Sequence, residues 1–86
     1  MTVLFYGDIQ KYTLGEKSFK ATYVPNISVL INELGKHFGE RFKEFLQSDG
    51  NCFFLINGKG ITTTGGLFTP LQADDIIEIL PVVEAG

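Results

Sequence analysis

The chain has 86 residues, of which 44% are hydrophobic, and a formal net charge of −3. This length supports one small domain, and the eight phenylalanines and three tyrosines supply enough apolar area for a core without a metal or a disulfide. The acidic balance, without a lysine or arginine cluster, argues against nucleic acid or an anionic membrane as a partner. No apolar run approaches the roughly 20 residues that cross a bilayer, and the first residues lack the pattern of a signal peptide, so we expect a cytoplasmic protein.

The first quarter of the chain predicts a β-hairpin. Residues 2–6 form an apolar run on both faces of a strand, which is typical of a central strand covered by a helix. Gly7 and Asp8 interrupt this run. Residues 17–23 then alternate, with Phe19, Ala21 and Tyr23 on one side and polar residues on the other. This pattern predicts a half-exposed strand that pairs with the first.

A helix is expected next, beginning after Asn26 and ending at Gly39. Asn26 is a good N-cap, because its side-chain oxygen can accept a hydrogen bond from the first turn. The apolar residues that follow have helical spacing and form one stripe: Ile27, Leu30, Ile31, Leu34 and Phe38. A shorter pattern at Phe42, Phe45 and Leu46 predicts one or two further turns. We favour core packing for this group, with a docking patch as the alternative.

The second half predicts three more strands. Residues 52–56 are apolar on both faces and are expected to be buried, and Asn57-Gly58 after them is a strong signal for a type I′ turn. The returning run 59–64 is short and polar, which places it at the sheet margin. A turn at Thr69-Pro70 then leads to a strand over residues 76–80, which Pro81 is expected to end because it has no N–H.

These elements fit an α+β fold in which one mixed sheet of four or five strands wraps one main helix. The domain is expected to span residues 1–81. Residues 82–86 are then predicted to form a flexible tail that could reach roughly 17 Å at about 3.3 Å per residue. Such a tail could enter another protein, and glycine at its end could pass through a narrow slot.

The order of the motifs resembles that of the β-grasp, ubiquitin-like sulfur carriers, the family of the molybdopterin-synthase small subunit and the thiamine sulfur carrier. The resemblance covers nearly the whole chain. It depends on four stretches in their order and spacing: residues 3–7 (VLFYG), 26–34 (NISVLINEL), 55–59 (LINGK), and 69–71 (TPL) through 79–81 (ILP).

The resemblance implies a carrier and not an enzyme. In that family the carboxylate of the last glycine, here Gly86, is adenylated by a ubiquitin-activating-type (E1-like) enzyme and becomes a thiocarboxylate. ATP and the sulfur donor are used by that activating partner, so this chain is expected to bind no cofactor of its own. Gly58-Lys59-Gly60 lacks the residues of a phosphate-binding P-loop, which agrees with activation by another protein.

The resemblance also implies the partners and the binding residues. The neck that seats the tail would be Leu80, Pro81, Val82 and Val83, followed by Glu84 and Ala85. The sulfur-accepting partner would be the large subunit of molybdopterin synthase or another enzyme. Molybdopterin or tungstopterin cofactor synthesis is favoured, with thiamine, cysteine and tRNA thiolation as the alternatives.

The tail departs from the family pattern at one position. The family usually ends in two glycines, whereas here Ala85 precedes Gly86. The extra methyl group fits where the backbone φ is negative and costs about 1–2 kcal/mol where a left-handed residue is required. A variant partner that accepts Ala85 is the favoured interpretation. The alternatives are a ubiquitin-like protein modifier or an interaction module without carrier activity.

The remaining reactive side chains predict no second site. Cys52 lies within an apolar run and is interpreted as a core residue. His37 has no second histidine or cysteine near it in the pattern, so we expect no metal site there. Asp74 and Asp75 enter a strand and are expected to cap the local backbone. One cysteine and one histidine do not make up a nucleophile, base and oxyanion set.

Overall fold

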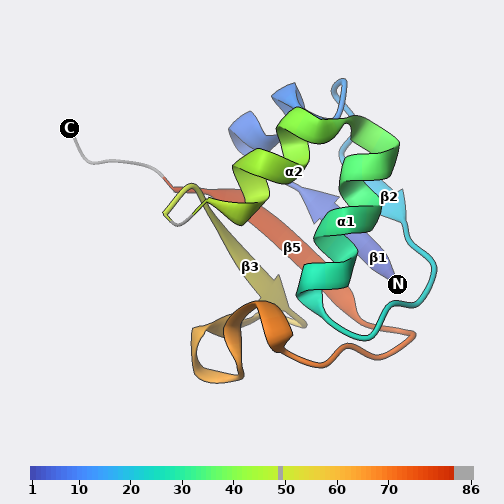
Figure 1. Cartoon of the computed structure of the whole chain (residues 1–86), viewed down its shortest axis with the longest axis vertical. Helices are drawn as coiled ribbons and strands as arrows, with labels where there is room; N and C mark the ends of the chain where they lie inside the picture. Colours follow the sequence, from blue (N-terminus) through green and yellow to red (C-terminus); the bar gives the residue numbers. More distant parts are fainter. Residues whose placement is uncertain (49, 83–86) are drawn as a thin grey trace.

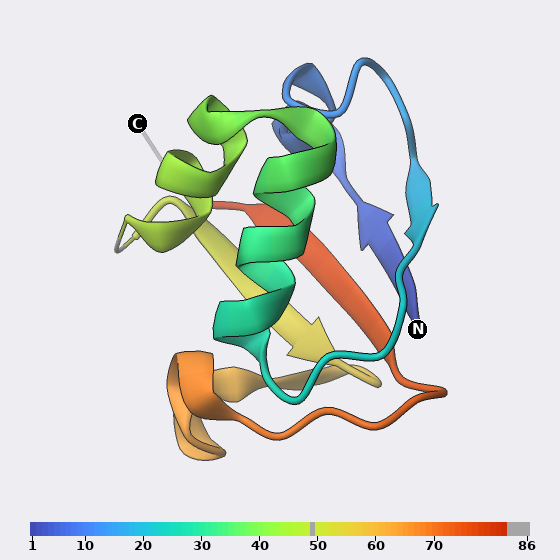
Figure 2. The ribbon, with the colours of Figure 1, turned by 45° about the vertical axis from the view of Figure 1, so that its right-hand side comes forward.

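The computed structural model describes residues 1–48 and 50–82, in which a five-stranded sheet packs against two helices on one of its faces (Figures 1 and 2). The strands lie in the order β2-β1-β5-β3-β4. β1 and β5 are parallel, and every other neighbouring pair is antiparallel. This arrangement confirms the α+β, β-grasp fold. The strands are β1 (Thr2–Phe5), β2 (Ser18–Lys20), β3 (Cys52–Ile56), β4 (Lys59–Gly60) and β5 (Ile76–Pro81).

The helix that crosses the sheet is α1 (Ile27–Phe38). Its N-cap is Asn26, whose side-chain oxygen accepts a hydrogen bond of 3.0 Å from the backbone N–H of Val29. Gly39, with a φ of +118°, ends α1 and begins α2 (Glu40–Gln47), because glycine adopts such angles without a steric penalty. Both the capping residue and the helix end are as the sequence predicted.

The core lies between this helical layer and the inner face of the sheet. The apolar stripe of α1 is fully buried at Ile27, Leu30, Ile31 and Leu34. Phe42 of α2 packs edge-on against Phe5 of β1, with ring centroids 5.9 Å apart. Leu46 is also buried and Phe45 stacks on Tyr12, so this group belongs to the core, as the favoured interpretation held. The core also contains Val3, Ile9, Val24, Phe54, Ile61, Leu71, Ile77 and Ile79.

The first hairpin is shorter than predicted. β2 has three residues where the sequence pattern covered seven, from 17 to 23, since β1 pairs with it only over Thr2, Val3 and Leu4. Phe19 packs partly against the core, whereas Tyr23, expected on the same side, is 54% exposed.

Pro81 ends the sheet ladder on the side of β1. Tyr6 N–H donates to the carbonyl oxygen of Ile79 at 3.1 Å. In a parallel ladder the next hydrogen bond would run from the N–H of residue 81 to the carbonyl oxygen of Tyr6, but proline has no N–H. The carbonyl oxygen of Tyr6 instead accepts a hydrogen bond of 3.2 Å from Ile9 N–H. This bond starts the 3-10 helix η1 (Gly7–Lys11).

On the side of β3 the ladder continues, so the expectation that the strand stops at Leu80 is wrong by one residue. β5 includes Pro81, which lies opposite Cys52. One residue further on, Val82 N–H donates to the carbonyl oxygen of Asn51 at 3.3 Å. Proline is tolerated here because its nitrogen faces the side on which β1 has already ended.

The turn after β3 has the predicted conformation. Asn57 and Gly58 have φ values of +50° and +85°, as a type I′ turn requires. The returning strand β4 is an edge strand of two residues and continues into the 3-10 helix η2 (Ile61–Thr63), which a second one, η3 (Gly66–Phe68), follows.

Candidate functional site: the neck and the outer sheet face

The predicted neck begins at the end of β5. Leu80 and Pro81 belong to the strand, and Val82 continues its pairing by one residue. Val83, Glu84, Ala85 and Gly86 lie outside the described residues, so their predicted roles stay predictions.

The start of the neck packs closely on the turn that follows β1. Gly7 has a φ of +55°, and a Cβ built there would lie 3.2 Å from Cγ of Pro81. A side chain at Gly7 would be strained by this backbone angle and by the proline ring together. The pairing of Val82 and the contact of Pro81 fix the point and direction from which the chain continues.

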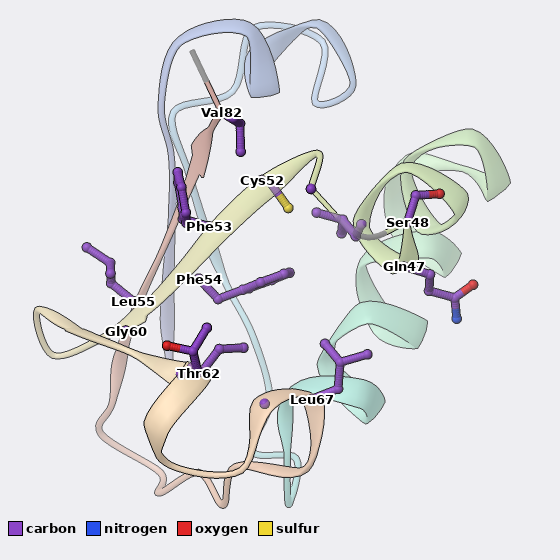
Figure 3. A pocket seen from close by; sticks show the side chains of 14 residues that line it. Gln47, Ser48, Cys52, Phe53, Phe54, Leu55, Gly60, Thr62, Leu67 and Val82 are labelled. Carbon is purple, nitrogen blue, oxygen red and sulfur yellow. The ribbon is translucent and has the colours of Figure 1, made fainter. Parts of the chain in front are cut away.

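The neck adjoins the sheet face that carries no helix. We call this the outer face and define it by Leu4, Tyr6, Phe53, Leu55, Ile76, Glu78 and Leu80. These residues alternate along their strands with the buried ones, and Figure 3 shows Phe53 and Leu55 pointing away from the side taken by Cys52 and Phe54.

Large apolar side chains are exposed on this face. Phe53 is 56% exposed, Ile76 is 46% exposed and Tyr6 is 39% exposed. The expectation that residues 52–56 are buried on both faces is therefore wrong for Phe53, because both helices cover the same face of the sheet. Phe53 lies directly opposite Leu80 in the register, so the apolar surface reaches the neck. An apolar patch of this kind is typical of a protein-binding surface.

A single acidic group lies among these apolar side chains. The hydroxyl of Tyr6 donates a hydrogen bond of 2.8 Å to Oε2 of Glu78. This hydrogen bond to Glu78 is the main cause that raises the pKa of Tyr6, with desolvation and the negative charge of Glu78 adding to it. Tyr6 is thus held as a neutral donor, and the outer face presents one carboxylate within apolar surroundings.

The other candidate residues do not belong to the outer face. Cys52 points to the opposite side of β3 (Figure 3), where burial raises the pKa of its thiol to about 11. His37 is exposed on α1, with its ring 4.5 Å from that of Phe19. Asp75 is buried and caps its loop by accepting from Gln72 N–H at 2.8 Å, as predicted. Asp74, also expected to cap, is exposed.

This arrangement places an exposed apolar surface beside the end of β5. Within residues 1–48 and 50–82 there is no cluster of three or more metal-binding side chains, and no helix in this part is long and apolar enough to span a membrane. The sequence predicted the neck but did not identify Phe53 and Tyr6 as exposed residues beside it. The alternation of Tyr6 with Phe5 indicated that the two side chains lie on opposite faces of the sheet. The run at residues 52–56 is apolar throughout and did not indicate which face is exposed.

A comparison with models of protein families shows to which family the chain belongs. A sequence model of the ThiS family matches residues 3–86. The chain belongs to the ThiS family. This assignment confirms the family of β-grasp sulfur carriers that the sequence motifs resemble, and members of this family are small carrier proteins. A comparison with curated protein sequences gives no match.

Solved structures with this fold include complexes with other proteins and a protein modifier. A BexX/CysO complex of Amycolatopsis orientalis matches with a TM-score of 0.82 at 20% identity, over 99% of this chain and 98% of that one. The small archaeal modifier protein 1 of Methanosarcina acetivorans matches with a TM-score of 0.78 at 22% identity, over 99% and 94%. A complex of subunits 1 and 2 of the molybdopterin-converting factor of Helicobacter pylori matches with a TM-score of 0.65 at 30% identity, over 99% and 96%.

Proposed function

We propose that this ThiS-family protein is a non-catalytic sulfur carrier whose Gly86 carboxylate is adenylated and then converted to a thiocarboxylate. The observation that carries this proposal is the family match, which extends through Ala85 and Gly86. A carboxylate is a poor electrophile, and the described residues contain no phosphate cradle, so an E1-like partner would use the ATP and the sulfur donor. We place this chemistry in the cytoplasm.

The outer face and the neck are the proposed docking surface for both partners. The activating enzyme and the sulfur-accepting enzyme must each hold the tail in an active site. A partner that covers Phe53 and Leu80 would gain apolar contact next to Val82, where the tail begins. Glu78 would select a partner that presents a cation within an apolar surface.

Molybdopterin or tungstopterin synthesis is the pathway we propose, with the large subunit of molybdopterin synthase as the sulfur acceptor. The similarity to the molybdopterin-converting factor complex of Helicobacter pylori, at 30% identity over nearly the whole chain, supports this choice. Similarity to a CysO-containing complex keeps other sulfur-transfer routes as alternatives.

A protein-modifier function is the second candidate. It is favoured by the similarity to the small archaeal modifier protein 1. In that case Gly86 would be joined to a lysine of a target protein, and the same activation by adenylation would precede the transfer.

Intact mass spectrometry after incubation with the cognate activating enzyme, ATP and a sulfur donor tests the proposal. The carrier function predicts a species heavier by the difference between one sulfur and one oxygen atom, and a variant without Gly86 should not form it. An adduct between the chain and a protein lysine, with no sulfur-containing form, would support the modifier function instead.

A further inference from the structure

β3 has a free backbone edge over part of its length. Asn51 before the strand and Asn57 after it form backbone hydrogen bonds with Val82 and Ile76. In an antiparallel ladder the backbone groups of successive residues point to opposite sides, so the odd-numbered residues bond to β5 and the N–H and C=O groups of Cys52 and Phe54 point away from it. There β4 pairs only with Leu55 and Ile56. Within the part of the chain that the structure describes, no backbone group bonds to Cys52 or Phe54 on that side.

An apolar cavity of about 530 Å³ lies beside this edge. Cys52 and Phe54 of β3 project into it from one side, and Leu67 of η3 lies on another (Figure 3). Leu46 of α2 and Ile61 of η2 also line it. None of the 14 lining residues carries a charged side chain. Its size is within the range of about 300–1,000 Å³ that is usual for ligand pockets.

The two sheet edges differ in how they are protected. The edge strand β2 carries exposed Lys20 and follows exposed Lys17, and edge lysines are a common defence against the addition of another strand. On the other side of the sheet, Lys59 of the short edge strand β4 is exposed, but none of the described residues that line the cavity beside Cys52 and Phe54 is charged. Val82 also lines the cavity, so a protein that holds the neck could reach the cavity with a second segment.

We propose that the β3 edge and its cavity form a docking site for an extended, uncharged segment of a partner protein. The segment adds to the sheet as a strand and bonds to the free N–H and C=O groups of Cys52 and Phe54. Its alternate apolar side chains fill the cavity. Two donor–acceptor pairs spaced two residues apart match a peptide backbone. This inference goes beyond the sulfur chemistry and stands without it.

The test uses the full chain and a synthetic peptide of about eight residues. The peptide alternates valine and threonine, has blocked ends and carries a terminal lysine at each end for solubility. Titration into the isotope-labelled protein, followed by NMR, should give saturable shifts of the Cys52 and Phe54 amide signals and slower hydrogen exchange there. Two further peptides carry N-methyl groups on the odd-numbered or on the even-numbered residues. One of the two should bind about tenfold or more weakly, because its methyl groups replace the N–H groups that bond to β3.

Two matched variants locate the site. Thr62 is exposed at the cavity rim and Thr22 is exposed in the loop after β2, at the far edge of the sheet. Thr62→Lys places a charge at the rim and should weaken binding about tenfold or more, whereas Thr22→Lys should leave it unchanged.

The proposal is overturned if no saturable shift occurs, if the shifts lie on β2, or if Thr62→Lys binds like the unchanged protein. Shifts of Cys52 and Phe54 that depend on protein concentration in the absence of peptide would assign the edge to a second copy of the chain. That outcome would also overturn it.

Discussion

Replacing Asp75 by alanine removes the group that holds the loop before β5. Asp75 is 8% exposed, and its carboxylate accepts from Nδ2 of Asn57 at 2.9 Å and from Gln72 N–H at 2.8 Å. Oδ1 of Asn57 in turn accepts from Ile76 N–H at 2.9 Å. The variant leaves two donors without an acceptor and loosens the turn between β3 and β4, which this network ties to β5.

The expected loss follows from these two hydrogen bonds. A hydrogen bond to a charged acceptor contributes about 1.5–3 kcal/mol. Gln72 is exposed, so its N–H can bond to water instead, and we expect a total loss of about 3 kcal/mol in the free energy of unfolding. For a domain of this size each kcal/mol lowers the melting temperature by about 4–8 °C, which gives a decrease of about 12–24 °C.

Urea and thermal unfolding followed by circular dichroism measure this loss. The neighbour Asp74 is exposed and serves as the matched control, because Asp74→Ala should change the stability by no more than about 0.5 kcal/mol. If Asp75→Ala lies within about 1 kcal/mol of the unchanged protein, or equals Asp74→Ala, the network does not hold the loop and the reasoning is refuted.

Three further predictions concern the outer face, the thiol and the helix pair. Phe53→Ala should weaken binding of the activating enzyme about 100-fold in calorimetry, because roughly 110 Å² of exposed ring would be buried in the complex. Phe68 on η3 is even more exposed, at 78%, but lies outside the outer face, so Phe68→Ala should have no effect; equal affinities of the two variants would exclude the outer face. Alkylation of Cys52 at pH 9 should be about fiftyfold slower in the folded chain than in urea, since burial raises its pKa to about 11 and disfavours the thiolate. The folded state also keeps this proton as the pH rises from about 9 to about 11, so stability should fall more over that range in the unchanged protein than in Cys52→Ala; equal alkylation rates would contradict the burial. Gly35→Ala should lower stability by about 1–3 kcal/mol in urea unfolding, because the new Cβ would lie 2.8 Å from Cβ of Lys43 where the helices meet; a more stable variant would show that helix propensity outweighs this contact.

The elements with local signals were predictable from the sequence. Asn26 caps α1, Gly39 separates α1 from α2, and Asn57-Gly58 forms the turn after β3. Each of these depends on the conformational preference of one or two residues. The apolar stripe of α1 likewise needed only its own spacing to identify the buried side.

Features that depend on neighbouring elements were not predictable in the same way. The exposure of Phe53 follows from the position of both helices on one face, which an apolar run does not encode. The continuation of β5 through Pro81 depends on where β1 ends. The free edge at Cys52 and Phe54 arises because β4 has only two residues. The family, in contrast, was recognisable from motif order along the chain.

The most direct measurement of the sulfur-carrier function is the mass of the C-terminal fragment of this protein isolated from its native cells. The chain is purified without acid, digested, and the fragment that contains Gly86 is analysed by high-resolution mass spectrometry. We predict a fraction in which one carboxylate oxygen is replaced by sulfur, and this fraction should disappear when the activating enzyme is deleted. A fragment that carries only oxygen, in cells actively making the cofactor, would contradict the carrier function.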